Sequence, residues 1–399
     1  MKRLIVSSLL LTLGTAAHSA DGASPSSVED RLKKLEQELQ AVQKENLELR
    51  RELGVGSGAT ASFVKPGARS ALEVRLGGYI QTQAEFGDTG DARWTGLSSN
   101  DRFYVRRARA SIFGSFLEKF TYRMETDFAG ALGQQSALRA QLTDGWVSYN
   151  PYDFLNVRVG QFFPTYGWEK RLSPMLEQSV ELSLATDRFL PDRQLGIQVG
   201  GGVFEKRLGY YLGVFNGNNV NNNFNDDDNF QIVPRLEVNA WRGKMADRDS
   251  FINFGVNATF SDDTSIAVPS EWLVPGRTTF SGYRTGLAAD AQIRLGPVDI
   301  WLEDMVLFLD PNNGDDFTAY GGYAQATYLI TPKIQALAKY EYYDANNDES
   351  DDFTQTGTFG IAYLFKGDNL KVMLNYLLMD VAGEDDLEHK LLLRLQAGF

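Results

Sequence analysis

The side chains with the clearest chemistry in this chain are arginines gathered in the segment 102–109, Arg-Phe-Tyr-Val-Arg-Arg-Ala-Arg. Successive side chains of a regular strand point to opposite faces, so Arg106 and Arg107 can share a face only at a bulge or beyond the sheet. Guanidinium groups that line a passage attract anions. If neighbouring acids pair with them, the same arginines form a structural network instead, and the sequence supports both interpretations. The nearest such acids are Glu125 and Asp127.

Catalytic and metal chemistry have little support in the sequence. The chain has two histidines, His18 and His389, and no cysteine, so a nucleophilic triad has few candidate bases and thiolate metal sites are excluded. Segments rich in Asp and Asn, such as 218–228 and 346–352, do not have the spacing of a known calcium loop. We therefore expect no enzyme, no metal and no cofactor.

The arginines belong to segments whose polarity alternates with a period of two. From Leu72 onward we count sixteen such segments, each of which predicts a β-strand. The last segment, 388–399, shows the pattern most plainly. Leu391, Leu393, Leu395, Ala397 and Phe399 lie on one face, opposite Lys390, Arg394 and Gln396. A sheet with one apolar and one polar face in every strand is typical of a transmembrane barrel, which meets lipid outside and water inside.

Composition and connection lengths agree with a barrel. Mean hydropathy is -0.29, and no apolar run beyond the N-terminus reaches 18 residues, which excludes membrane-spanning helices. The net charge of -13 argues against a nucleic-acid partner. Short turns alternate with long polar segments, as tight periplasmic turns alternate with outer loops in outer-membrane barrels. We expect the long segments near 87–101, 130–137, 164–192, 217–229, 261–278, 310–316, 344–353 and 383–387. The sequence therefore predicts an all-β, sixteen-stranded antiparallel transmembrane barrel with an aqueous channel.

The longest of these segments, 164–192, carries both charges and apolar residues. Its apolar side chains need burial, which the segment can obtain by folding into the lumen and narrowing it, or by packing as an outer cap. Together with the arginines of 102–109 and their neighbours, it supplies our candidate pore or constriction residues. These are Arg106, Arg107, Arg109, Arg123, Lys170, Arg171, Arg188 and Arg193.

The N-terminal part has a different character. Residues 1–20, with Lys2 and Arg3 before an apolar run, predict a signal peptide, or less readily an anchor helix. Residues 21–53 contain a heptad pattern over 28–53 that predicts a short periplasmic α-helical coiled coil, or else one amphipathic helix lying on the barrel. Residues 54–71 read as a flexible linker, and residues 72–399 as the barrel.

Several motifs resemble the phosphate-selective porin (O and P type) family of Gram-negative outer membranes. Phe103-Tyr-Val-Arg-Arg-Ala-Arg109 is similar to a family strand, and Val159-Gly-Gln-Phe162 with Tyr166-Gly-Trp-Glu169 is similar to the run that opens the family's third loop. The chain departs from the family at Phe163 and Leu182, where the family often has basic residues. The resemblance implies a sixteen-stranded barrel, a homotrimer, and a channel for small anions narrowed by inward loops.

From these patterns we expect a porin of the Gram-negative outer membrane that lets small hydrophilic solutes and ions, including phosphate, diffuse passively. Its expected contacts are membrane lipid and lipopolysaccharide, two further copies of the chain, and the cell wall through residues 28–53. The alternatives are a structural anchor that tethers the envelope through the coiled coil, and a non-selective or weakly cation-preferring pore.

Overall fold

The computed structural model describes residues 72–94, 101–129, 140–222, 224–225, 227–273 and 276–399, and before them only residues 37, 61 and 62. Contacts divide the chain into two compact units, Met1–Val55 and Gly56–Phe399, and the second holds all the strands. The predicted signal peptide lies outside the described residues. So do the coiled coil, apart from helical Gln37, and the linker, apart from residues 61 and 62.

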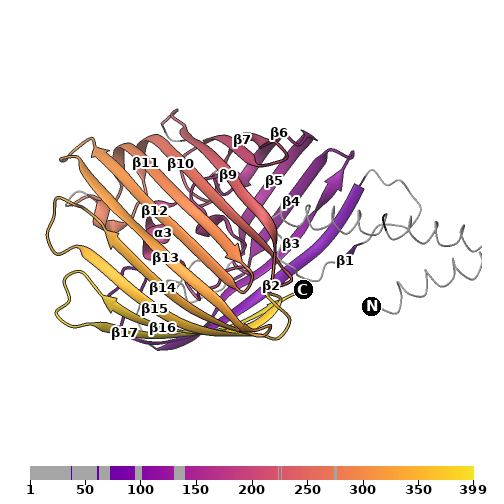
Figure 1. Ribbon diagram of the computed structural model, residues 1–399. Coiled ribbons are helices and arrows are strands. Elements are labelled where there is room, and N and C mark those ends of the chain that lie inside the picture. The colour runs from indigo at the N-terminus through magenta and orange to yellow at the C-terminus, as the bar shows by residue number, and fades with distance from the viewer. Residues whose placement is uncertain are drawn as a thin grey trace, which may run out of the picture. The chain divides into compact units, whose positions relative to one another are not determined.

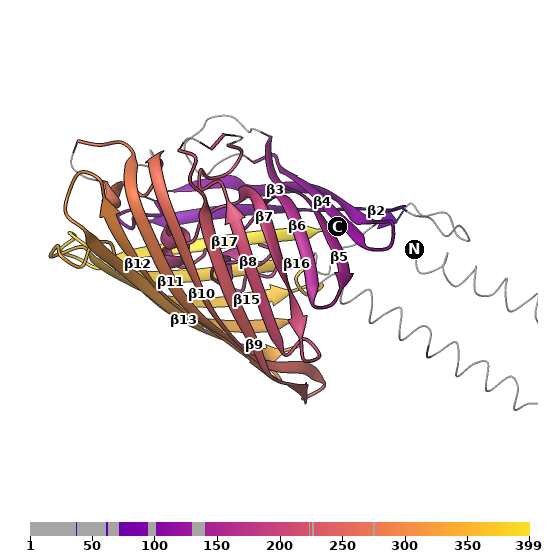
Figure 2. The same ribbon diagram turned by 90° about the horizontal axis from the view of Figure 1, so that it is seen from above.

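Sixteen antiparallel strands form a closed barrel (Figures 1 and 2). They are β2 (Leu72–Gly87), β3 (Arg102–Phe116), β4 (Phe120–Asp127), β5 (Gln141–Tyr152), β6 (Leu155–Phe162), β7 (Gln194–Val203), β8 (Leu208–Phe215), β9 (Gln231–Met245), β10 (Arg248–Ile266), β11 (Phe280–Leu295), β12 (Val298–Pro311), β13 (Phe317–Thr331), β14 (Ile334–Asp344), β15 (Phe353–Leu364), β16 (Leu370–Asp380) and β17 (Glu388–Gly398). Each strand pairs with the next, and β17 pairs with β2 from Gly398↔Tyr79 to Lys390↔Gly87, which leaves no open edge between first and last strand. The sixteen-stranded prediction is confirmed.

A further short strand, β1 (Ala61–Ser62), pairs with Leu76 and Arg75 of β2. This stretch of β2 lies before Tyr79, where the pairing with β17 ends. β1 therefore pairs with the part of β2 that β17 does not reach.

The strand connections alternate between short turns and long loops, as predicted. Turns such as 153–154 and 246–247 join strands at one rim, whereas 163–193 and 216–230 join them at the other. One boundary was wrong: the long segment expected to begin at 261 begins after Ile266, because Ser261, Asp262 and Asp263 of β10 still pair with β11. Among the described residues, no helix is long and apolar enough to cross a membrane.

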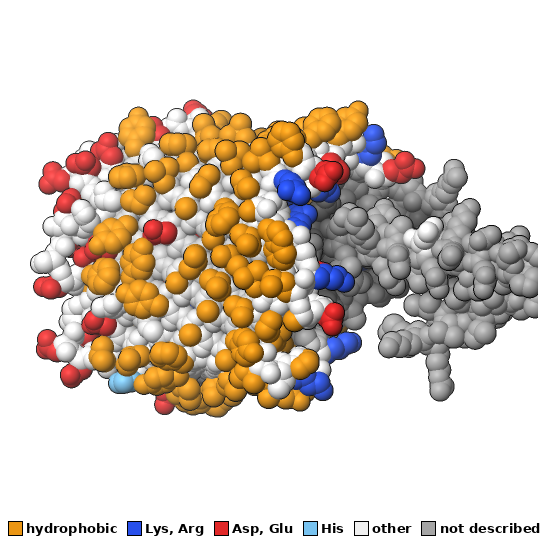
Figure 3. Space-filling model, viewed as in Figure 1, with side chains coloured by type: hydrophobic (Ala, Val, Ile, Leu, Met, Phe, Trp, Pro, Cys, Tyr) orange, Lys and Arg blue, Asp and Glu red, His pale blue; other side chains and the backbone are white. Residues whose placement is uncertain are grey.

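Side-chain burial follows the alternation of the sequence. In β17, Lys390, Arg394 and Gln396 are almost completely buried inside, whereas Leu391, Leu393 and Leu395 are exposed on the outer wall. Figure 3 shows apolar side chains covering the wall, with acidic side chains along the left rim and Lys and Arg, together with a few acidic side chains, at the right. Exposed aromatic side chains stand near both rims, as in an aromatic girdle: Tyr149, Tyr152, Phe154, Tyr328 and Tyr363 toward the short turns, and Tyr283, Phe308, Tyr340, Phe353 and Tyr376 toward the long loops.

Candidate pore constriction

The third long connection, residues 163–193 and here called loop 3, folds into the barrel. It contains a 3-10 helix, η1 (Glu169–Arg171), and a short α-helix, α3 (Leu184–Phe189). Ser183 is the N-cap of α3, and its side chain accepts a hydrogen bond from the Thr186 amide. Val180, Leu184 and Phe189 are buried. Helix α3 packs against β12, β13 and β14, so loop 3 lies in the lumen, as its apolar content predicted, rather than forming an outer cap.

The wall holds the beginning of loop 3 through its main chain. Glu303 of β12 accepts hydrogen bonds from the amides of Trp168 (2.6 Å) and Glu169 (3.1 Å). Asn257 of β10 accepts one from the Gly167 amide (2.7 Å). A carboxylate bound by two amides at the start of a short helix suits the partial positive charge of that end. These contacts join the first part of loop 3 to strands four and six places along the barrel from β6, where the loop starts.

The far side of loop 3, around residues 175–181, meets β16 and β17. Lys371 donates to the carbonyls of Met175 (2.9 Å) and Glu177 (2.7 Å), and Gln396 donates to that of Met175 (3.0 Å). The Val180 amide donates to Asn375 (2.6 Å). Loop 3 is therefore hydrogen-bonded to β10 and β12 near its start and to β16 and β17 around residues 175–181, while α3 packs on β13 and β14, across the barrel from β6.

Two candidate arginines hold this part of loop 3. The predicted bulge is present: Gln81 pairs with Arg107 and Thr82 with Val105, so Arg106 is the extra residue. The bulge lets both guanidinium groups reach loop 3. Arg106 binds Glu181 through two contacts of 3.1 Å, and Arg107 approaches Glu177 at 3.4 Å.

A third arginine, which the sequence analysis did not select, joins this site. Arg394 of β17 donates to Glu177 (3.0 Å), Glu181 (2.8 Å) and Gln83 (2.8 Å) and is 0% exposed. We call Arg106, Arg107, Arg394, Glu177 and Glu181 the tip cluster. Its only signal in the sequence was the inward register position of Arg394, which says nothing about a partner in a loop 213 or more positions away.

A second group, the wall cluster, contains Arg109, Arg123 and Arg193. Arg109 binds Asp127 (2.8 Å) and Glu125 (3.2 Å), and Arg123 binds Glu125 and Asp144. Arg193, at the end of loop 3, binds Asp144 (2.8 Å) and lies over the Phe163 ring (4.0 Å). These arginines thus form the network with Glu125 and Asp127 that the sequence left open as an alternative to free anion-binding groups.

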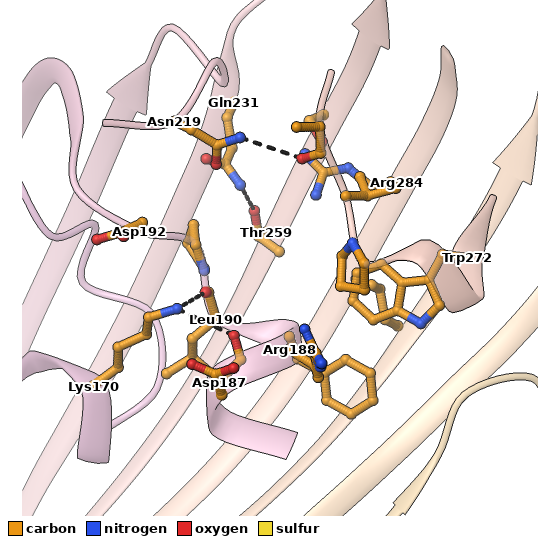
Figure 4. A pocket seen from close by; sticks show the side chains of 17 residues that line it. Lys170, Asp187, Arg188, Leu190, Asp192, Asn219, Gln231, Thr259, Trp272 and Arg284 are labelled. Atoms are coloured by element: carbon orange, nitrogen blue, oxygen red, sulfur yellow. Dashed lines mark hydrogen bonds between the residues drawn. The ribbon is translucent and has the colours of Figure 1, made fainter. Parts of the chain in front are cut away.

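The remaining candidates lie elsewhere on loop 3. Lys170 and Arg188 line a cavity of about 260 Å³ together with Arg284, Asp187, Asp192 and Trp272 (Figure 4). Lys170 donates to the carbonyls of Leu190 (2.8 Å) and Asp187 (3.3 Å), and Arg188 pairs with Glu271 (3.2 Å). Arg171 is separate from this cavity and binds Glu237 (3.0 Å). All eight candidates therefore belong to the lumen wall or to loop 3, in three groups and one single pair.

The charged groups of loop 3 respond to these partners. Burial disfavours the ionised form of Glu181, but Arg106 and Arg394 outweigh it and hold the pKa of this carboxyl well below its usual range. Burial likewise opposes ionisation of Asp192, yet Lys170 and Arg193 keep its pKa below the usual value. Burial raises the pKa of Glu169, which Lys339 approaches at 3.6 Å. Loop 3 therefore carries ionised carboxylates where arginines face it.

Solved outer-membrane proteins share this architecture. The outer-membrane channel DcaP of Acinetobacter baumannii is 12% identical, with a TM-score of 0.58 over 82% of this chain and 97% of that one. The outer-membrane expressed OmpT of Vibrio cholerae is 14% identical, with a TM-score of 0.56 over 83% of this chain and 99% of that one. The anion-selective porin of Comamonas acidovorans is 12% identical, with a TM-score of 0.55 over 82% and 99%. At these identities the likeness shows the fold. No curated protein sequence matches the chain.

A closed sixteen-stranded barrel with an apolar outer wall, a charged lumen and an inward loop defines the class of outer-membrane porins. Within that class, the chain belongs to the family of phosphate-selective porins O and P, whose model matches residues 76–399. The protein is thus a porin of the outer membrane, and its barrel is a channel for passive diffusion of ions and small hydrophilic solutes.

Proposed function

We propose that small ions, phosphate and other small anions among them, diffuse past loop 3 through a single barrel lumen. The crossing of the lumen by loop 3 carries this proposal. The loop is held by β12 near its start and by β16 and β17 around residues 175–181, and charged side chains line its path. Such a lining replaces part of the hydration of a permeating ion, as in other selective pores. The eight predicted candidates are proposed to line or position this constriction.

Two features of the channel act in opposite directions on its preference for anions or cations. The tip cluster has three arginines and two glutamates, an excess of one positive charge. The outer loops joining β12 to β13, β14 to β15 and β16 to β17 are acidic and favour cations at the mouth. A weak preference for anions at the constriction, reduced by the acidic mouth, fits both. The weakly cation-preferring pore remains the competing proposal.

The decisive measurement is the reversal potential of purified protein in a planar bilayer under a potassium chloride gradient, repeated with phosphate replacing chloride. Discrete conductance steps are expected, with current carried by chloride and by phosphate. A barrel that passes no current would favour the structural anchor. A reversal potential of cation-selective sign that does not change with the anion would favour the competing pore.

We also infer that the protein has no enzymatic role. The described part of the chain contains one histidine, His389, which hydrogen-bonds to Tyr376 (2.6 Å) on the exposed outer side of β17, away from the acids of the lumen. A general base there would face lipid rather than a soluble substrate. Purified protein incubated with generic ester, peptide and phosphoester substrates should show no turnover, and any saturable turnover would refute this inference.

The assembly we propose is a homotrimer in contact with lipid and lipopolysaccharide, with residues 28–53 in the periplasm. Strands β4, β6 and β8 have 8 residues each, whereas β9 to β13 have 14 to 19. The barrel wall is therefore shorter over β4 to β8. Outward aliphatic side chains there, such as Val159, Ile197 and Leu212, are exposed, and a second copy of the chain would cover them. Native mass spectrometry in detergent tests the trimer, and binding to purified peptidoglycan with and without residues 21–53 tests cell-wall contact.

A further inference from the structure

We propose that Glu177 and Glu181 determine the charge selectivity of this channel, because loop 3 supplies the carboxylates that neutralise three arginines of the barrel wall. The proposal deepens the function proposed above and rests on it, since selectivity exists only if ions pass. The two glutamates are specificity-determining residues in this scheme, and the arginines are the groups whose charge they cancel.

The contacts are tight and enclosed. Arg394 binds Glu177 at 3.0 Å and Glu181 at 2.8 Å, and Arg106 binds Glu181 at 3.1 Å. Exposure of the side chains involved is low: 0% for Arg394, 6% for Glu177 and 12% for Glu181. Where water is largely excluded, a unit charge acts more strongly on its surroundings than in bulk solvent. The charges of the tip cluster therefore act strongly on an ion that passes beside loop 3.

The source of the carboxylates separates this cluster from the other arginine sites. Arg235 pairs with Asp290 (2.6 Å), Arg284 with Asp263 (2.5 Å) and Arg109 with Asp127 (2.8 Å), and in each pair both partners belong to barrel strands. Hydrogen bonding between strands fixes those pairs. In the tip cluster the arginines belong to β3 and β17, whereas both carboxylates belong to loop 3. The neutralisation of Arg106, Arg107 and Arg394 therefore depends on side chains that the barrel itself does not supply.

The charge balance gives the expected direction. The cluster carries three positive and two negative charges, so replacing both glutamates by glutamine raises its excess from one positive charge to three. Glutamine keeps the length of glutamate and one acceptor oxygen, but it removes the charge and replaces the second acceptor by a donor. Three uncompensated guanidinium groups beside the path would attract anions and repel cations. The channel should therefore become strongly anion-selective.

The test is single-channel recording of Glu177→Gln with Glu181→Gln in a planar bilayer, with the reversal potential measured in a potassium chloride gradient. We expect the chloride-to-potassium permeability ratio to rise about tenfold or more over wild type, a change that corresponds to about 1.4 kcal/mol. A matched control, Asp304→Asn, removes a carboxylate from the outward side of β12, away from both the lumen and the rim. It should leave the ratio unchanged.

A second variant separates charge from loop position. Glu177→Gln with Arg394→Gln removes the ion pairs that Arg394 makes with Glu177 and Glu181, so it also weakens the attachment of loop 3 to β17. It nevertheless leaves the tip cluster with its original excess of one positive charge. It should keep the wild-type permeability ratio even if its conductance changes. If this variant becomes as anion-selective as the double glutamate variant, the position of loop 3 sets selectivity and the proposal fails.

The remaining outcomes are also decisive. An unchanged ratio in folded, conducting Glu177→Gln/Glu181→Gln protein would overturn the proposal. If that variant does not fold, the single change Glu177→Gln, which leaves Glu181 on Arg106 and Arg394, should give a smaller shift in the same direction, and no shift would overturn it. A wild-type barrel that passes no current would instead refute the function on which the proposal rests.

Discussion

At the scale of single residues, the buried carboxylate of Glu181 is the clearest source of stability inside the lumen. It pairs with Arg106 and Arg394, both enclosed. Glu181→Gln leaves two buried guanidinium groups without this partner, so we expect the free energy of unfolding to fall by about 3–5 kcal/mol. Chemical denaturation of the protein in lipid vesicles measures it. A loss below about 1 kcal/mol would mean that water or an ion replaces the carboxylate.

The same residue predicts a pH dependence. Because the pKa of Glu181 is lower in the folded protein than in the unfolded chain, its stabilisation is complete above the unfolded value of about 4.3 and is lost as the pH falls toward the folded value. The stability difference between wild type and Glu181→Gln should therefore be constant from pH 8 to about pH 5 and shrink below about pH 4. Denaturation series of both proteins across this range test it, and a difference that already shrinks near pH 6 would contradict the lowered pKa.

A second residue of interest faces outward. Asp304 lies on the exposed face of β12 with Leu302 and Phe308, and its carboxylate accepts a hydrogen bond from Tyr342 (2.7 Å), which reaches it across Gly322. A carboxylate on the lipid side of a strand is unfavourable even when hydrogen-bonded. We expect Asp304→Leu to stabilise the barrel by about 1–2 kcal/mol.

Tyr342→Phe provides the control for Asp304. It should cost about 1 kcal/mol in the wild type and almost nothing in the Asp304→Leu background, because its partner is then absent. Denaturation of the four proteins completes the cycle. If Asp304→Leu destabilises the barrel, the carboxylate meets a polar partner rather than lipid.

At the scale of the elements, the alternation of side chains in the sequence predicts much of the fold. A period of two identified the sixteen strands and their inward faces, and β17 shows why: each lipid-facing leucine and each buried Arg or Lys occupies the position its parity requires. The same parity left two explanations for Arg106 and Arg107, a bulge or a position beyond the sheet, and the structure has the bulge. Strand ends were less certain, as the extension of β10 to Ile266 shows.

The path of loop 3 could not be read in this way. Its contacts join residues far apart in the chain, such as Glu177 with Arg394 and Trp168 with Glu303, and no periodic pattern records such pairs. The sequence indicated that loop 3 needed burial and that the arginines needed partners. It did not indicate that the polar groups of loop 3 would pair with those of the barrel wall. For this reason the sequence analysis missed four site residues: Arg394, Glu177, Glu181 and Glu303.

Loop 3 gives the prediction that belongs to this scale. Replacing residues 172–183 by a short Gly-Ser linker removes both glutamates and the contacts to β16 and β17, so the lumen should widen toward that of an open sixteen-stranded barrel. We expect the single-channel conductance to rise roughly twofold or more and larger sugars to enter vesicles. Replacing 346–351 at the rim is the control and should change neither. Unaltered sugar uptake after loop 3 shortening would show that the constriction lies elsewhere.

At the scale of the whole molecule, the two rims of the barrel differ in charge. The segments 310–316, 344–352 and 380–388, at the rim of the long loops, contain thirteen acidic residues and no Lys or Arg. The turns at the opposite rim are mixed in charge, with Lys119, Lys206, Lys333 and Lys366 beside acids such as Glu118, Glu205 and Asp368. An ion approaching from the side of the long loops therefore meets a negative field before it reaches the tip cluster.

The two fields differ in how salt screens them, and this distinguishes the mouth from the constriction. Exposed charges act over about 10 Å at 0.1 M salt but only about 3 Å at 1 M, whereas enclosed charges are screened far less. Replacing Asp315, Asp316, Asp348, Asp351, Asp385 and Asp386 by Asn should therefore shift the permeability ratio toward anions at 0.1 M and leave it near wild type at 1 M. Glu177→Gln with Glu181→Gln changes the enclosed tip cluster, so its shift of the permeability ratio toward anions should persist at both salt concentrations. Reversal potentials of the two variants at both salt levels make the comparison. If the rim variant keeps its full shift at 1 M, its carboxylates act from within the lumen and not from the mouth.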